Sequence, residues 1–260
     1  MQPKKLLMNW KKLFKILIFI LFLAFLFLWL RSGFWKVKEV KCQFNQLNCN
    51  QEIEKKLEEL SVGENVLFFP STKIIKKIKE NYPQISLVKI KKQIPQRIFF
   101  EMTSRKPVVA FSNELFSENE ADSSDLEEPQ FVSSGDYYLV DDQGMVIQKI
   151  EEKQNFPLIL LKKDFQLNIG QQISQPEILK AIEIVSGMRL RLLEPKVALP
   201  LSLREIKVWL EGGLLTNFNG EKDIQVQLDS LQFIYSRSKI EGKKIKKIDL
   251  RFEKPVVVFN

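Results

Sequence analysis

The most continuous hydrophobic pattern in the chain is an apolar run near its start. Every residue from 16 to 30 is apolar, and lysines cluster before the run. About 20 such residues are the length that a helix needs to cross a bilayer. Trp10 and Trp29 stand where interfacial aromatic residues belong. The pattern predicts a transmembrane helix at residues 13–31, with a cytoplasmic tail at 1–12 and the remaining chain outside the cytoplasm.

A cleaved secretory signal is the alternative interpretation of the same run. The run is long for the apolar part of a signal, and the residues that follow it, WLRSGFW, contain no small-residue cleavage site. We therefore expect an uncleaved, single-pass membrane anchor that carries an external body of about 230 residues.

Residues 34–111 alternate between strand-like and helix-like patterns. FWKVKEVKCQF alternates as a strand does, and Ile53, Leu57 and Leu60 then share one face of a helix that opens with an asparagine cap. A second helix begins at STKIIKKI and stops before Pro83. Two alternating strands follow across an IPQR turn, and the segment closes on SRKPVVAF. The order predicts a compact β-α-α-β-β domain.

Residues 112–136 form a break in this pattern. They contain eight carboxylates, many serines and no lysine or arginine. Such a composition cannot bury enough apolar surface to fold by itself, which predicts a flexible acidic insertion. A calcium site is the alternative, but the spacing of a D-x-D-x-D-G loop is absent.

Residues 137–260 read as a second α+β domain. YYLVDDQGMVIQKI is a hairpin, a helix starts near Pro176, and a second hairpin turns on Gly212-Gly213. A further helix, which ends at Gly242, is followed by a closing strand. Its predicted inward residues are Ile224, Leu228, Leu231 and Ile234.

Charge and composition exclude several classes of function. The net charge is +8, but residues 1–31 carry six of these positive charges, and the remaining 34 basic residues face 32 acidic ones. An evenly mixed body is not the footprint of a nucleic-acid-binding protein. The chain has no histidine, which excludes imidazole metal sites and histidine-based catalysis. We expect no cofactor, no metal and no small-molecule substrate.

One catalytic motif occurs by spacing alone. Ser86-Leu87-Val88-Lys89 is a literal S-x-x-K, the motif that opens a helix in penicillin-binding proteins. Here it lies in an alternating strand, so Ser86 and Lys89 point to opposite sides, and no K-T-G follows. The sequence predicts that the protein is not an enzyme.

The two cysteines, Cys42 and Cys49, are close in the chain. In an exported domain they could form a short-loop disulfide, and the alternative is a pair of thiols packed as small apolar side chains.

The chain ends on KKIDLRFEKPVVVFN, an alternating strand followed by a proline and an uncharged apolar run. Ile248, Leu250 and Phe252 are expected on one face of the strand, and Lys247, Asp249 and Arg251 on the other. Pro255 lacks a ladder donor, which indicates a sheet edge. Either the tail folds back onto its own core, or the open edge docks a partner.

Several of these motifs together resemble the FtsQ/DivIB family of cell-division proteins. The resemblance rests on the single anchor, on LSVGENVLFF, YP and VKIKKQIPQRIFFEM in residues 34–111, on SRKPVVAF, on YYLVDDQGMV with FPLI, and on KIDLRF near the end. It covers the chain apart from the acidic insertion, and Ser104 stands where the family usually has glutamate. It implies a POTRA domain at 34–111 and, at 137–260, a mostly antiparallel curved sheet with two helices.

The resemblance also implies a function. Proteins of this family are thought to be divisome scaffolds that hold FtsB/DivIC-like and FtsL-like coiled-coil proteins, among other divisome membrane proteins, by the C-terminal strand region. Partner strands would add to the edge at Val256 and Val258. Arg251 and Phe252 match the family's DLR-Y/F motif, and Arg204 on the LREIKVWL strand resembles a second basic contact; Phe252 replaces the tyrosine of some members.

The implied location is the cell (inner) membrane at the division septum. The alternative function is a POTRA-bearing envelope protein that serves secretion or outer-membrane assembly. That class predicts further POTRA repeats or a following barrel, and this sequence has one such unit.

Overall fold

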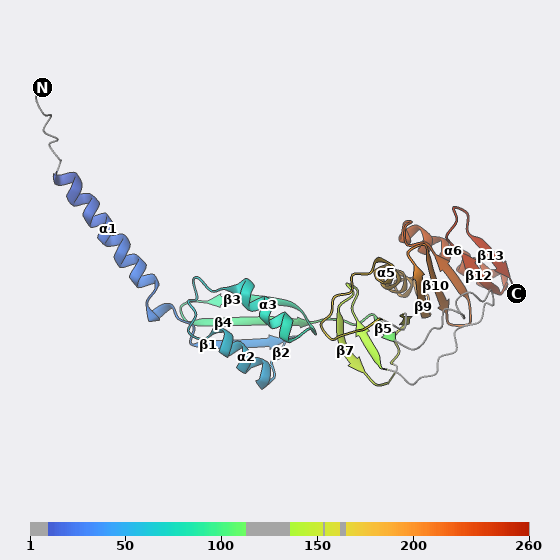
Figure 1. The fold of residues 1–260 in the computed structure, drawn as a ribbon, viewed down its shortest axis with the longest axis horizontal. Helices are drawn as coiled ribbons and strands as arrows, with labels where there is room; N and C mark the ends of the chain where they lie inside the picture. The colour runs from blue at the N-terminus through green and yellow to red at the C-terminus, as the bar shows by residue number, and fades with distance from the viewer. Residues whose placement is uncertain (1–9, 113–135, 153, 162–164, 260) are drawn as a thin grey trace, which may run out of the picture. The chain divides into compact units, whose positions relative to one another are not determined.

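The computed structural model describes residues 10–112, 136–152, 154–161 and 165–259, with side chains in its first helix from Phe14 onward. Two compact units are present (Figure 1). The first unit contains Met1–Lys79 and Ile85–Ser104, and the second contains Glu80–Gln84 and Arg105–Asn260.

The first helix, α1 (Trp10–Leu30), precedes a short 3-10 turn, η1 (Gly33–Trp35). Among the residues that the structure describes, no helix combines the length and the apolarity that crossing a membrane requires. This finding contradicts the predicted transmembrane helix at residues 13–31.

The first unit is an α+β layer of one sheet and two helices. Its strands are ordered β2-β1-β4-β3, with β1 parallel to β4 and antiparallel to β2, and β3 antiparallel to β4. The parallel neighbours β1 and β4 need a crossover connection. The chain between them contains the two helices, followed by β3. The elements are β1 (Glu39–Phe44), β2 (Leu47–Asn48), α2 (Gln51–Ser61), α3 (Ser71–Asn81), β3 (Ile85–Gln93) and β4 (Arg97–Ser104).

The helices of the first unit form where the apolar spacing predicts them. Ile53 and Leu57 of α2 and Ile74 and Ile78 of α3 are buried, as are alternate residues of the central strand β4: Ile98, Phe100 and Met102. Burial of one stripe on each helix and one face of the sheet creates a single core layer.

The boundary between the units differs from the predicted one. Residues 34–111 were expected in one domain, but β5 (Val109–Ser112) pairs with β6 and β8 of the larger sheet. The compact first unit therefore ends at Ser104. Local alternation predicts that 109–112 is a strand, but it contains no information about which sheet the strand joins.

The second unit is built on a sheet of nine strands in the order β13-β12-β11-β10-β9-β8-β5-β6-β7. Five neighbouring pairs are antiparallel and three are parallel. The remaining elements are β6 (Tyr137–Val140), β7 (Val146–Ile150), β8 (Leu158–Leu160), α5 (Pro176–Leu190), β9 (Pro195–Ser202), β10 (Glu205–Leu210), β11 (Leu215–Phe218), α6 (Ile224–Glu241), β12 (Ile245–Asp249) and β13 (Val256–Phe259).

Both faces of the large sheet bury apolar side chains. The main cluster contains inward residues of α5 and α6, such as Ile182 and Leu228, packed on strand residues such as Ile248. A second cluster on the opposite face contains the strand residues that alternate with these, among them Trp209 and Leu215. The sheet is therefore fixed from both sides, and its strand register determines which side chains reach each face.

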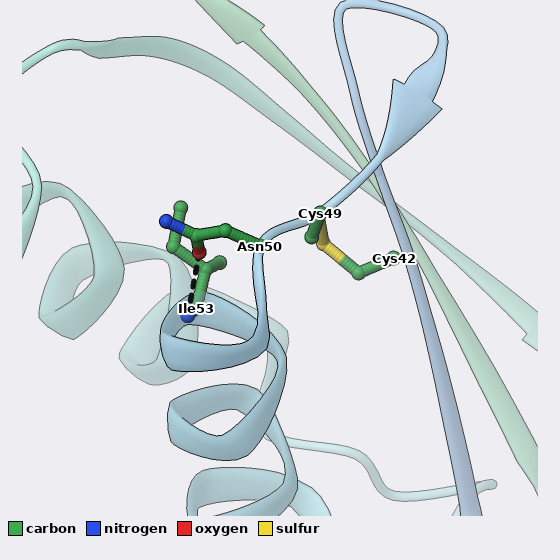
Figure 2. Close-up of a disulfide and its surroundings, with 4 residues drawn as sticks. All are labelled: Cys42, Cys49, Asn50 and Ile53. Carbon is green, nitrogen blue, oxygen red and sulfur yellow. Dashed lines mark hydrogen bonds between the residues drawn. A yellow bond between two sulfur atoms is a disulfide. The ribbon is translucent and has the colours of Figure 1, made fainter.

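A disulfide joins Cys42 of β1 to Cys49, with the Cα atoms 5.5 Å apart, so the two cysteines are not free thiols (Figure 2). The next residue, Asn50, is the N-cap of α2: its side-chain oxygen accepts a hydrogen bond of 2.9 Å from the backbone N–H of Ile53. Cys49 and Asn50 directly precede α2. The disulfide ties this segment to β1, and the cap ties it to the first turn of the helix.

Replacing Cys42 and Cys49 together by alanine is expected to lower the free energy of unfolding of the first unit by about 2–3 kcal/mol, because the unfolded chain regains the entropy of the open loop. Denaturant titration of both proteins, with and without reductant, measures the effect. Reductant should destabilise the native protein and leave the variant unchanged. Equal midpoints for native and variant protein would contradict a stabilising disulfide.

Candidate partner-binding edge

The terminal strand β13 is the edge of the nine-stranded sheet, because β12 is its sole strand neighbour among the described residues. The expectation that the tail folds back is met, and docking of a partner at this edge stays a prediction. The tail folds back as a hairpin on β12, and Val257 packs against the main core. Val256 and Val258 remain 49% and 41% exposed. A strand whose outer side is unpaired and uncharged is available for pairing with another chain.

The register determines which face the exposed valines occupy. Val257 lies opposite Ile248, which is buried under the helices. Since side chains alternate, Val256 and Val258 lie on the face away from the helices, opposite Asp249 and Lys247 respectively. Apolar and charged side chains therefore adjoin on this face of the edge.

Asp249 is buried and pairs with Arg251. The Arg251 Nη2–Asp249 Oδ2 distance is 2.7 Å, and the Arg251 Nε–Asp249 Oδ1 distance is 3.0 Å. Burial alone would raise the pKa of Asp249, but the hydrogen bonds and the charge of Arg251 outweigh it, so the pKa is lowered. The carboxylate stays ionised and holds the guanidinium at the end of β12.

Arg251 also reaches across the sheet to β10. Its Nη1 lies 3.3 Å from a carboxylate oxygen of Glu205. The pKa of Arg251 is raised by its hydrogen bonds to Asp249, and the charge of Glu205 contributes. A carboxylate on a partner would have to displace Glu205, or bind beside it, to reach this guanidinium. Within the chain, Arg251 holds the end of β12 against β10.

Phe252 does not occupy the position that strand alternation predicts. β12 ends at Asp249, and residues 251–254 form a bend before β13. Ile248 and Leu250 are buried as expected, but Phe252 is 57% exposed. The prediction failed because the strand ends three residues earlier than the alternating pattern does. The exposed ring lies at the turn that connects the last two strands.

Arg204 lies in the turn between β9 and β10 rather than on a strand. Its side chain is 78% exposed and its Nε is 2.9 Å from a carboxylate oxygen of Glu221. An exposed pair of this kind is weak and exchanges readily. Arg204 is therefore the more accessible of the two arginines.

The structure thus brings together four of the predicted residues at the end of β12 and in β13: Arg251, Phe252, Val256 and Val258. Arg204 is not among them: it pairs with Glu221, although Glu205, the next residue in sequence, pairs with Arg251. Sequence reasoning missed the supporting residues Asp249 and Glu205. The i, i+2 spacing of Asp249 and Arg251 on one strand face was a usable signal for the first of these.

Comparisons with known proteins add no assignment: no family model and no curated protein matches the chain. Within the described ranges, no group of three or more His, Cys, Asp or Glu side chains is arranged to hold a metal ion.

Replacing Arg251 by glutamine is expected to lower the free energy of unfolding by about 1–3 kcal/mol at neutral pH, because the buried Asp249 carboxylate loses its cation. The lowered pKa means that the pair stabilises the fold fully above the unfolded pKa of ~3.9 and loses this contribution as pH falls through the folded value. The deficit of the variant should therefore shrink below a pH of about 4.

Chemical denaturation at a series of pH values tests this expectation. The control is Arg204→Gln, which removes an exposed pair and should cost less than about 1 kcal/mol at every pH. If the loss of unfolding free energy in Arg251→Gln does not change with pH, ionisation of Asp249 is not its cause.

Proposed function

We propose that this protein is a non-enzymatic scaffold of bacterial cell division, which binds FtsB/DivIC-like and FtsL-like coiled-coil proteins through the edge strand β13. The observation that carries the proposal is the open, uncharged edge with two exposed valines, Val256 and Val258. The sequence resemblance to the FtsQ/DivIB family supports the choice of partners and the support of septal wall synthesis.

Binding would occur by addition of a partner strand. Main-chain hydrogen bonds along the open side of β13 would supply affinity, and side chains on alternating positions would supply specificity. Val256 and Val258 share one face with Asp249 and Lys247, so a partner strand that presents apolar residues there would bury the two valines. The exposed ring of Phe252 extends the apolar surface at the turn.

Acidic side chains on the partner would add a second contact. The Arg204 guanidinium is largely exposed and pairs with Glu221. Guanidinium groups pair with carboxylates in a bidentate geometry. Because β10 is three strands away from β13, the acidic residue that replaces Glu221 would come from a part of the partner that extends past the added strand. Charge here would act mainly on the association rate and on the choice of partner.

The folded units are proposed to lie outside the cytoplasm, at the division septum. The disulfide between Cys42 and Cys49 supports this location, since such bonds form and persist in oxidising compartments. Apart from the two-residue strand β2, the element order of the first unit follows the β-α-α-β-β pattern expected from the resemblance to a POTRA domain. A role in secretion remains the alternative that the binding experiment must distinguish.

Binding of the purified protein to the external segments of the coiled-coil division proteins from the same organism tests the proposal. We expect Val256→Glu to weaken binding at least about tenfold, equal to about 1.4 kcal/mol, because a charge would be desolvated at the added strand. Truncation after Phe252, which removes β13, is expected to abolish binding. Arg251→Glu should also weaken binding, since it places three carboxylates together.

Val62→Glu is the matched control. Val62 is 53% exposed in the first unit, so the same substitution there should leave the dissociation constant unchanged. Circular dichroism of each variant confirms that the fold is retained. Binding that survives Val256→Glu and the truncation would move the site away from β13, and absence of binding by the native protein would favour the secretion alternative.

A further inference from the structure

The outer surface of α6 carries an apolar stripe that no described residue covers. Val226, Phe233 and Ile240 are 62%, 66% and 87% exposed. They are spaced by seven residues, which is close to two helical turns, so they lie in one row along the helix. The inner side of the same helix is already buried in the main core. A helix that packs on one side only should be polar on the other side.

The turn after α5 adds two more exposed leucines beside this stripe. Leu190 and Leu192 are 85% and 90% exposed. Arg191 between them donates to Asp229 Oδ1 at 2.6 and 3.0 Å and to Gln225 Oε1 at 3.1 Å. Because Asp229 lies on α6 between Val226 and Phe233, these bonds hold the turn along the border of the stripe.

The backbone at Leu192 is a second, independent sign of a contact surface. Its φ is 58°, the left-handed conformation that glycine adopts without strain and that is unfavourable for other residues. The N–H groups of Leu192 and Leu193 donate to Arg189 O and Met188 O and end α5, a helix ending in which glycine is usual. A strained and exposed leucine contributes nothing to the core of this unit, and such outliers concentrate at functional positions.

The stripe is self-complementary when two copies of α6 run antiparallel. With Phe233 facing its own copy, Val226 faces Ile240 of the other chain, and the three apolar layers repeat symmetrically. The same alignment sets Asp229 against Arg237, both of which are exposed on α6. Ser230 faces Ser236, and Gln225 faces Glu241. No pair of like charges is brought together along the helix.

We propose that α6 is a homodimer interface, in which two copies of this chain pair antiparallel about a two-fold axis that passes beside Phe233. Each copy contributes the same surface, as a two-fold interface requires. The symmetry of the charges about Phe233 favours a second copy over an unrelated helix, whose charges would not have to match this order. The exposed leucines of the α5 turn extend the contact beyond α6.

This interface is separate from the terminal edge. Val256 and Val258 lie on the face of the sheet away from the helices, whereas the stripe lies on the outer side of α6. The inference therefore does not rest on the proposed function, and substitutions in one surface should leave the other intact.

Sedimentation of the full chain over a range of concentrations tests the proposal, in a mild detergent that covers the exposed apolar side chains of α1. We expect a monomer–dimer equilibrium. Phe233→Glu places two carboxylates on the axis and should weaken the dimer at least about tenfold. Phe68→Glu is the matched control, since Phe68 is 71% exposed in the first unit. Val256→Glu should leave dimerisation unchanged.

Cysteine cross-linking tests the antiparallel geometry, because both native cysteines are in the disulfide. Mild oxidation should cross-link Phe233→Cys to itself. It should also cross-link a mixture of Ser230→Cys and Ser236→Cys chains, and neither of these two variants alone. Charge reversal provides the last test: Arg237→Glu sets a carboxylate against Asp229 of the other copy and should weaken the dimer.

A chain that remains monomeric at all concentrations would overturn the proposal. So would a dimer that Phe233→Glu leaves unchanged, or one in which Ser236→Cys cross-links to itself. A monomer in which Phe233→Glu weakens the binding of a coiled-coil partner would also overturn it and would assign the stripe to that partner.

Discussion

The position of β12 between β11 and β13 is the constraint on which the second unit's exposed surfaces depend. β12 follows α6 and pairs parallel to β11, so burial of Ile248 under the helices fixes its register. Through β12, the same register assigns Val257 to the core and leaves Val256 and Val258 on the other face. A shift of one residue would bury the two valines and expose the core, and would also separate Asp249 from Asn217, its partner position in β11.

The buried Asp249 carboxylate couples this register to the charged residues of the edge. Its pairing with Arg251 satisfies a charge that would otherwise be costly inside the fold, and the same guanidinium extends to Glu205 on β10. One arginine thus connects the end of β12 to a strand two places away in the sheet. The proposed partner contact and the stability of the fold consequently share a residue, so binding measurements on Arg251 variants need a stability control.

Patterns that depend on neighbours in sequence were predicted well. The inward face of α6, its end at Gly242 with φ 68°, and the hairpin on Gly212-Gly213 follow from helical spacing and turn chemistry. The sheet to which 109–112 belongs was missed because strand pairing is decided by distant partners. The exposure of Phe252 was missed because alternation cannot indicate where a strand stops. The burial of Asp249 depends on a pair that only the folded register completes.

The shortness of β13 has a consequence for any assembly built on it. Four residues offer an added strand only a few main-chain hydrogen bonds, each contributing about 1 kcal/mol net. These bonds would therefore contribute about 4 kcal/mol, which does not exceed the cost of association, so they would not hold a partner by themselves. The residence time of a partner on such an edge is determined by the side chains around it. A few substitutions there can lengthen it well beyond milliseconds. A junction of this kind can be released without unfolding either partner.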